Sequence, residues 1–194
     1  MHEVFFDYLK KFRSEPLTAE EKELIRQTFT PSKLRKRQFL LQAGNQCKHF
    51  AFIVKGAMRK YTVDDRGVEH IIQVGIENWW MGDRESFVES TPSLYHIDAW
   101  EHCELLCITL EGTLQLQERV PAFRDMKMKL DERNMMANTR RLASVISSQA
   151  DKRYTDFVEC YPELIARFPQ HIIASFIGIN KDTLSRVKRQ LNLK

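Results

Sequence analysis

The residues whose types and spacing best suit chemistry lie near the C-terminus, in the segment QHIIASFIGINKDTLSRVKR at positions 170–189. At about 100° per residue, Lys181, Asp182, Ser185, Arg186 and Arg189 fall on one arc of a helix. Cationic side chains bind guanine edges and phosphates, a carboxylate accepts from the cytosine amino group, and hydroxyls can do either. This arc therefore predicts a surface that reads the major groove of DNA.

The other arc of the same helix is apolar, because Leu184, Val187 and Leu191 fall within about 60° of one another. A helix divided in this way buries one face and offers the other to a partner. Arg186 is the best candidate for a bidentate contact to guanine. The predicted DNA-binding residues are Lys181, Asp182, Thr183, Ser185, Arg186, Lys188 and Arg189.

The residues before this helix supply the rest of a helix-turn-helix, which needs two short helices and a turn between them. Ile173 and Ile177 give the first helix a buried face, and Ala174 is small enough for close approach. Gly178 can adopt positive φ at the turn, and Asn180 is a suitable N-cap. The alternative is an ordinary helical hairpin with a solvated outer face. Such a hairpin would not require all of these positions to match the helix-turn-helix pattern.

Charge is distributed unevenly along a chain whose net charge is +4. From position 133 to the end, eleven Lys and Arg stand against five acids, a net charge of +6, while the remainder carries −2. Concentrated positive charge attracts a polyanion such as double-stranded DNA. A solvated basic face without a partner is the alternative.

Positions 32–110 change to short alternating segments rich in β-branched and aromatic residues, with glycines at 44, 56, 67, 75 and 82. That spacing is typical of antiparallel strands in a barrel or jelly roll. Before them, residues 1–30 predict two helices, the second capped by Thr18 with Glu21 three residues on. The predicted class is α+β, with an antiparallel β-roll and its N-terminal helices at 1–117.

A long helix is predicted to begin at Pro121 and to run to about residue 148, within a segment assigned to 118–149. An apolar stripe at heptad-like spacing predicts that this helix dimerises, although packing against its own β domain is an equally open alternative. The remaining residues, 150–194, form the predicted helix-turn-helix domain. The stripe consists of Met128, Met135, Leu142, Val145 and Ile146.

Other classes of function find little support. No nucleophile–base pair or metal cluster is readable, so neither an enzyme nor a resident metal or cofactor is expected. Cys103 and Cys107, four apart in a predicted strand, are interpreted as small buried hydrophobes. No apolar run approaches the ~18 residues of a membrane helix, and the N-terminus lacks signal-peptide features. We expect a cytoplasmic protein without a membrane partner.

With both halves in view, the chain resembles the bacterial Crp/Fnr regulators, which join a cyclic-nucleotide-binding-type β-roll to a long helix and a helix-turn-helix. The run LLQAGNQCKHFAFIVKGAMRKYTVDDRGVEHII matches the family's turn glycines and central strands. Lys181-Asp182-Thr183 and Arg186 stand where the family has Arg-Glu-Thr and Arg. The resemblance implies a homodimeric transcription regulator on a palindromic operator, with RNA polymerase as a further candidate partner.

The resemblance also locates an effector pocket, and there the sequence departs from members that bind cyclic AMP. Gly82-Asp83 stands at the family's Gly-Glu position, but the phosphate-binding Arg-Ser pair falls on Ser93-Leu94, with Arg84 as the only near cation. An unpaired buried phosphate is costly, so no tight cyclic-nucleotide binding is expected, and any small-molecule effector is of another kind. The candidate pocket residues are Gly82, Asp83, Arg84, Ser93, Leu94, Asn138 and Thr139.

Two features leave alternatives open. Asn138 and Thr139 lie where family members present polar groups to the base, and they serve either a different ligand or a dimer seam. Winged members continue past the recognition helix, whereas this sequence stops at Lys194, so the wing is either missing or belongs to a longer protein of which this sequence is a part. A second hypothesis is therefore a ligand- or partner-binding module whose helix-turn-helix no longer reads DNA.

Overall fold

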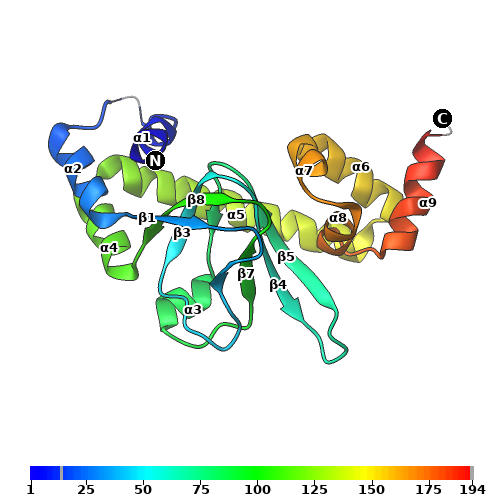
Figure 1. Cartoon of the computed structure of the whole chain (residues 1–194). Coiled ribbons are helices and arrows are strands. Elements are labelled where there is room, and N and C mark those ends of the chain that lie inside the picture. Colours follow the sequence, from blue (N-terminus) through cyan, green and yellow to red (C-terminus); the bar gives the residue numbers. More distant parts are fainter. Residues whose placement is uncertain (14, 193–194) are drawn as a thin grey trace.

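The computed structural model describes residues 1–13 and 15–192 and consists of a β-roll flanked by helices (Figure 1). Two antiparallel sheets form the roll, in the orders β1-β8-β3-β6 and β2-β7-β4-β5. This architecture confirms the predicted α+β class. The strands are β1 (Thr30–Leu34), β2 (Phe39–Leu41), β3 (Phe50–Lys55), β4 (Met58–Val63), β5 (Glu69–Gly75), β6 (Trp80–Met81), β7 (His96–Ala99) and β8 (Cys103–Ile108).

Two N-terminal helices, α1 (His2–Leu9) and α2 (Ala19–Thr28), cover one end of the roll. The predicted capping box is confirmed, since the Thr18 hydroxyl accepts from the Glu21 amide at 3.1 Å and the Glu21 carboxylate accepts from the Thr18 amide at 2.8 Å. Helix α1 buries Phe5 against Phe52 of β3, with ring centroids 4.9 Å apart. These contacts fix the helices to the sheet that faces the long helix.

One of the remaining helices stands between β6 and β7 in the chain and the others follow β8, and the longest runs alongside the roll toward the C-terminal helices (Figure 1). Pro121 opens the longest of them, where its missing amide leaves no helical bond unmade. Only the first turns of that helix pack on the roll, through buried Phe123 and Met126. The helices are α3 (Arg84–Glu89), α4 (Leu110–Arg119), α5 (Pro121–Ser147), α6 (Ala150–Cys160), α7 (Pro162–Arg167), α8 (Gln170–Phe176) and α9 (Lys181–Asn192).

A continuous apolar core joins the C-terminal helices to the second sheet. Tyr61, Ile71 and Val74 of β4 and β5 pack with Phe168 and Ile172 from the region of α7 and α8. In Figure 1, α8 accordingly lies beside β5. The helix-turn-helix is thus docked on the roll of its own chain. Among the described residues, no helix is long and apolar enough to cross a membrane.

Candidate nucleic-acid interface

Helices α8 and α9 are joined by a tight turn at residues 177–180. Gly178 has φ +71°, the left-handed conformation that glycine adopts without strain, and the next amide, of Ile179, donates to the Ala174 carbonyl at 2.9 Å. The Asn180 side-chain oxygen accepts from the Thr183 amide at 2.7 Å, which confirms the predicted N-cap. The turn therefore fixes where α9 begins and how it leaves α8.

Burial divides α9 as its periodicity predicts. Leu184 and Val187 are buried, and on α8 Ile173 and Ala174 are buried as well. Apolar contacts on these faces hold the two helices together, and α9 also packs against α6. Leu191 is the third residue predicted for this apolar face, and its side chain lies outside the part of the chain that the structure describes.

The opposite arc of α9 faces solvent. Lys181, Asp182, Arg186 and Arg189 are exposed, whereas the other three predicted residues are half-buried. Of those three, Ser185 donates its hydroxyl to the Lys181 carbonyl at 3.0 Å, so only its lone pairs remain for another partner. The arc thus presents three cations and one carboxylate on a rigid helix.

We expect Asn180→Ala to lower the free energy of unfolding by about 1 kcal/mol, because the Thr183 amide would lose its acceptor. Urea denaturation followed by far-UV circular dichroism measures the change. Gln190→Ala, at an exposed position of the same helix, serves as the control and should change stability by less than about 0.5 kcal/mol. Equal stability of the two variants would contradict the capping role.

The apolar stripe of α5 is exposed along its length. Met135 is 67% exposed and Ile146 is 76% exposed, and Met136, which was not part of the predicted stripe, adds to it. Packing of the whole stripe on its own β domain is therefore ruled out as the arrangement in this structure. Contiguous apolar side chains in water mark a surface that a partner covers.

The candidate effector pocket begins where β6 ends. Gly82 packs so close to Phe50 that a Cβ would lie 2.7 Å from its ring, and the Asp83 amide donates to the Cys47 sulfur at 3.4 Å. Lys60 of β4 donates to the Gly82 carbonyl at 3.3 Å, and burial lowers the pKa of Lys60. The prediction that Arg84 is the only cation near this site is therefore wrong.

Arg84 instead joins α3 to the long helix. Its guanidinium donates to both carboxylate oxygens of Asp131, at 2.5 and 2.9 Å, and Lys127 binds the same carboxylate at 2.8 Å. Ser93 is buried and accepts from the Tyr95 amide at 3.0 Å. Two of the predicted pocket residues, Arg84 and Ser93, are therefore already bonded to other residues of the chain.

The other predicted pocket residues lie on exposed surfaces. Leu94 is 73% exposed, so it contributes little to an enclosed site. Asn138 and Thr139 are exposed on α5, and the Thr139 hydroxyl donates to the Met135 carbonyl at 2.9 Å. Within one chain, the structure therefore brings Gly82 and Asp83 together with Lys60 rather than with the predicted set.

Comparison with known proteins agrees with this arrangement. Residues 31–120 match the family model of the cyclic nucleotide-binding domain. The transcriptional activator protein Anr of Pseudomonas aeruginosa is 24% identical over 169 residues, which cover 79% of this chain and 67% of that protein. These matches agree with the resemblance to the Crp/Fnr regulators, and residues 31–120 are similar to a cyclic nucleotide-binding domain.

Solved structures share the fold across most of the length of this chain. FixK2 from Bradyrhizobium japonicum superposes with a TM-score of 0.72 at 13% identity, covering 85% of each chain. CLP of Xanthomonas campestris, described as a c-di-GMP responsive global regulator, gives 0.71 at 15% identity, covering 91% of this chain and 92% of that one. At these identities the likeness establishes the fold.

Sequence reasoning missed two charged groups that the fold places at important positions. Lys60 resembles an outward-facing polar residue in an alternating strand, yet it reaches Gly82. Arg167 belongs to the cations of the basic C-terminal third, yet the fold turns it toward two acids of the β-roll. No local sequence pattern predicts either placement, because the partners of Lys60 and Arg167 lie far away in the sequence.

Proposed function

We propose that this chain is a transcription regulator of the Crp/Fnr type that binds duplex DNA through the exposed arc of α9. The observation that carries the proposal is the arc itself, in which Lys181, Arg186 and Arg189 project from a capped helix whose other face is buried. A helix of this kind presents its N-terminal residues to base edges in the major groove. Arg186 is the proposed guanine contact, and Asp182 is suited to a cytosine amino group.

We further propose that the protein acts as a homodimer joined along α5. The exposed stripe from Met128 to Ile146 supports this arrangement, because a second copy would cover it with the same residues. Two recognition helices related by a two-fold axis suit a palindromic operator with half-sites about 34 Å apart. RNA polymerase is the third proposed partner, as for a regulator acting at promoters, and the proposed location is the cytoplasm.

The proposed function is tested by fluorescence anisotropy with duplexes tiled across the region upstream of the protein's own gene. We expect saturable binding that weakens as salt is raised, because phosphate contacts release counterions. At one salt concentration, a duplex containing the operator should bind at least about 1,000-fold more tightly than a scrambled one. Absence of salt-sensitive binding to every duplex would contradict the proposal.

We expect no tight binding of cyclic AMP, because the Ser93-Leu94 position offers no cation and Lys60 supplies a single ammonium already bonded to the Gly82 carbonyl. Isothermal calorimetry with cyclic AMP should show no binding in the micromolar range. A Lys60→Gln variant is the matched control and should behave in the same way. A micromolar dissociation constant for the wild-type chain would contradict this interpretation of the pocket, and its loss in Lys60→Gln would assign the phosphate contact to Lys60.

A further inference from the structure

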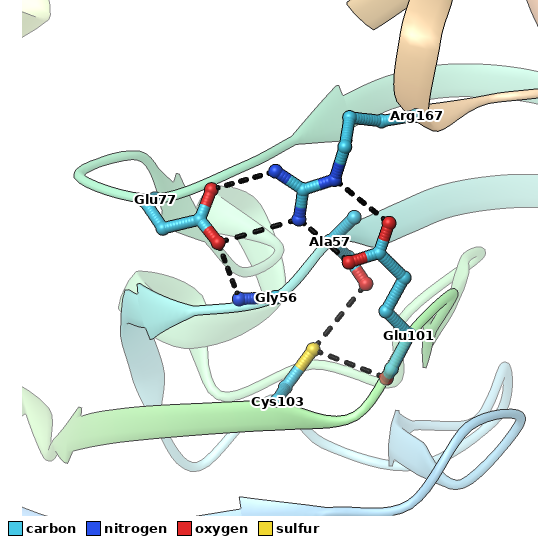
Figure 2. Close-up of polar contacts among 6 residues, drawn as sticks. All are labelled: Gly56, Ala57, Glu77, Glu101, Cys103 and Arg167. Atoms are coloured by element: carbon cyan, nitrogen blue, oxygen red, sulfur yellow. Dashed lines mark hydrogen bonds and ion pairs between the residues drawn. The ribbon is translucent and has the colours of Figure 1, made fainter.

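Arg167, the last residue of α7, reaches from the helix-turn-helix domain to the β-roll (Figure 2). Its Nε and one terminal nitrogen donate to Glu101 at 2.8 and 2.6 Å. Both terminal nitrogens donate to Glu77, at 3.0 and 3.3 Å. One guanidinium therefore bridges two carboxylates, from the β5–β6 and β7–β8 connections, and we call these three residues the clamp.

The acidic side of the clamp is held firmly. Glu77 also accepts from the Gly56 amide at 2.7 Å, and Gly56 sits at φ +101° where a Cβ would lie 2.3 Å from the His102 carbonyl oxygen. Hydrogen bonds to Glu101 and Glu77 raise the pKa of Arg167. Burial alone would raise the pKa of Glu77, but its hydrogen bonds with Arg167 lower it. Arg167 and Glu77 are therefore charged at neutral pH, and the contacts of Arg167 with both glutamates have the bidentate geometry that makes such pairs directional.

Two further contacts beside the clamp also join the β-roll to the C-terminal helices. The Trp100 ring, adjacent to Glu101, lies 6.1 Å from the ring of Phe168, which directly follows Arg167. On the edge strand β5, the Ile71 amide donates to the Ser175 hydroxyl of α8 at 2.9 Å. The roll is thus tied to α7 through Arg167 and to the end of α8 through Ser175.

The covalent link between the two parts is short and irregular. Helix α5 ends at Ser147, and both Ser148 and Gln149 have extended backbone before α6 begins. Such a link does not by itself fix the angle between α5 and the helix-turn-helix. Noncovalent contacts must set that angle, and in the resulting arrangement Lys181 and Arg186 face solvent.

We propose that Arg167 is a positioning residue for DNA recognition. It touches no base or phosphate, and through the clamp it holds the helix-turn-helix at the angle to the β-roll from which α9 reads DNA. This inference rests on the proposed function, and it withdraws one cation of the basic C-terminal third from contact with the polyanion. A helix-turn-helix that is already held in its binding orientation binds DNA more tightly than one that must be ordered on binding.

The first test is Arg167→Ala in the full-length chain, with DNA affinity measured across a salt series. We expect affinity to fall on the order of tenfold at each salt concentration, the range of an ordinary coupling between sites. The slope of log affinity against log salt should stay unchanged. Lys181→Ala is the comparison, and it should flatten the slope by about 0.9 for each phosphate that is no longer neutralised. A flattened slope for Arg167→Ala would overturn the proposal by making Arg167 a phosphate contact.

Glu101→Gln gives a second test, which depends on the sign of the effect. Removing an acid near DNA strengthens binding on electrostatic grounds alone, whereas loosening the clamp weakens it. We expect weaker binding, with an unchanged circular dichroism spectrum because the substitution is isosteric. Equal or tighter binding of Glu101→Gln would overturn the proposal, and so would tighter binding of Arg167→Ala.

The rate of hydrogen exchange at the Ile71 amide reports how firmly α8 is docked on β5, and it can be measured in the absence of DNA. Its acceptor lies on α8, so Arg167→Ala and Glu101→Gln should both speed its exchange relative to core amides of β8. Unchanged exchange in both variants would overturn the clamp. If the wild-type chain binds no duplex, the proposed function fails together with the role of Arg167 in recognition, whereas faster exchange would still establish the clamp itself.

Discussion

Replacing Arg186 and Lys181 together by alanine is expected to weaken binding to the operator by at least about 100-fold. A bidentate contact from a cationic side chain to guanine contributes about 1–3 kcal/mol of discrimination, and in a homodimer each substitution acts at both half-sites. Both side chains are exposed on the arc of α9, so their removal leaves the apolar face and the Asn180 cap intact. Anisotropy titrations at one salt concentration measure the weakening.

The two single variants separate the roles of the two side chains. Arg186→Ala should relax specificity at one base pair of each half-site, whereas Lys181→Ala should weaken operator and scrambled duplexes more equally. Arg35→Ala, which removes an exposed cation from the turn between β1 and β2, controls for net charge and should change affinity little. Operator binding that survives the double replacement unchanged would contradict the assignment of the reading arc.

Met135→Glu together with Leu142→Glu is expected to convert the homodimer to a monomer at micromolar concentration. Both side chains are exposed on α5, seven residues apart on the stripe. In a homodimer each glutamate would meet its own copy across the seam, and burying such unpaired charges costs several kcal/mol. Sedimentation velocity measures the oligomeric state. Operator affinity should fall with it, since each monomer engages only one half-site.

The matched control introduces the same charge on the other side of the helix. Ala137 is exposed and lies about 200° around α5 from Met135, so Ala137→Glu should leave the dimer intact. A wild-type chain that sediments as a monomer would contradict the dimer. The same conclusion would follow if the stripe variants sedimented as the wild-type dimer does.

Local periodicity explains why much of the fold could be predicted. In α9, Leu184 and Val187 repeat with the helical turn, and Asn180 caps the first turn through an amide three residues away, so the signal and the structure share one short stretch of chain. The capping box at Thr18 was predictable for the same reason. Alternating strands between turn glycines likewise determined the β-roll, because the period of two fixes which residues face inward.

Contacts between distant parts of the chain could not be predicted in this way. Arg167 is 66 residues from Glu101 and 90 from Glu77, and nothing near Arg167 marks it as an ion-pair partner rather than a DNA ligand. The pocket prediction erred because Arg84 is adjacent to Asp83 in sequence, whereas the start of α3 directs its side chain to Asp131 on α5. Sequence neighbours share a site only when the local backbone points their side chains the same way.

Hydroxyl-radical footprinting on a duplex recovered by selection from random sequence gives the sharpest test of DNA recognition by α9. We expect two protected patches on one face of the duplex, about 34 Å apart and related by two-fold symmetry, and we expect both to disappear with the Arg186→Ala and Lys181→Ala double variant. Recovery of no duplex, or protection that the double variant leaves unchanged, would contradict recognition through this helix.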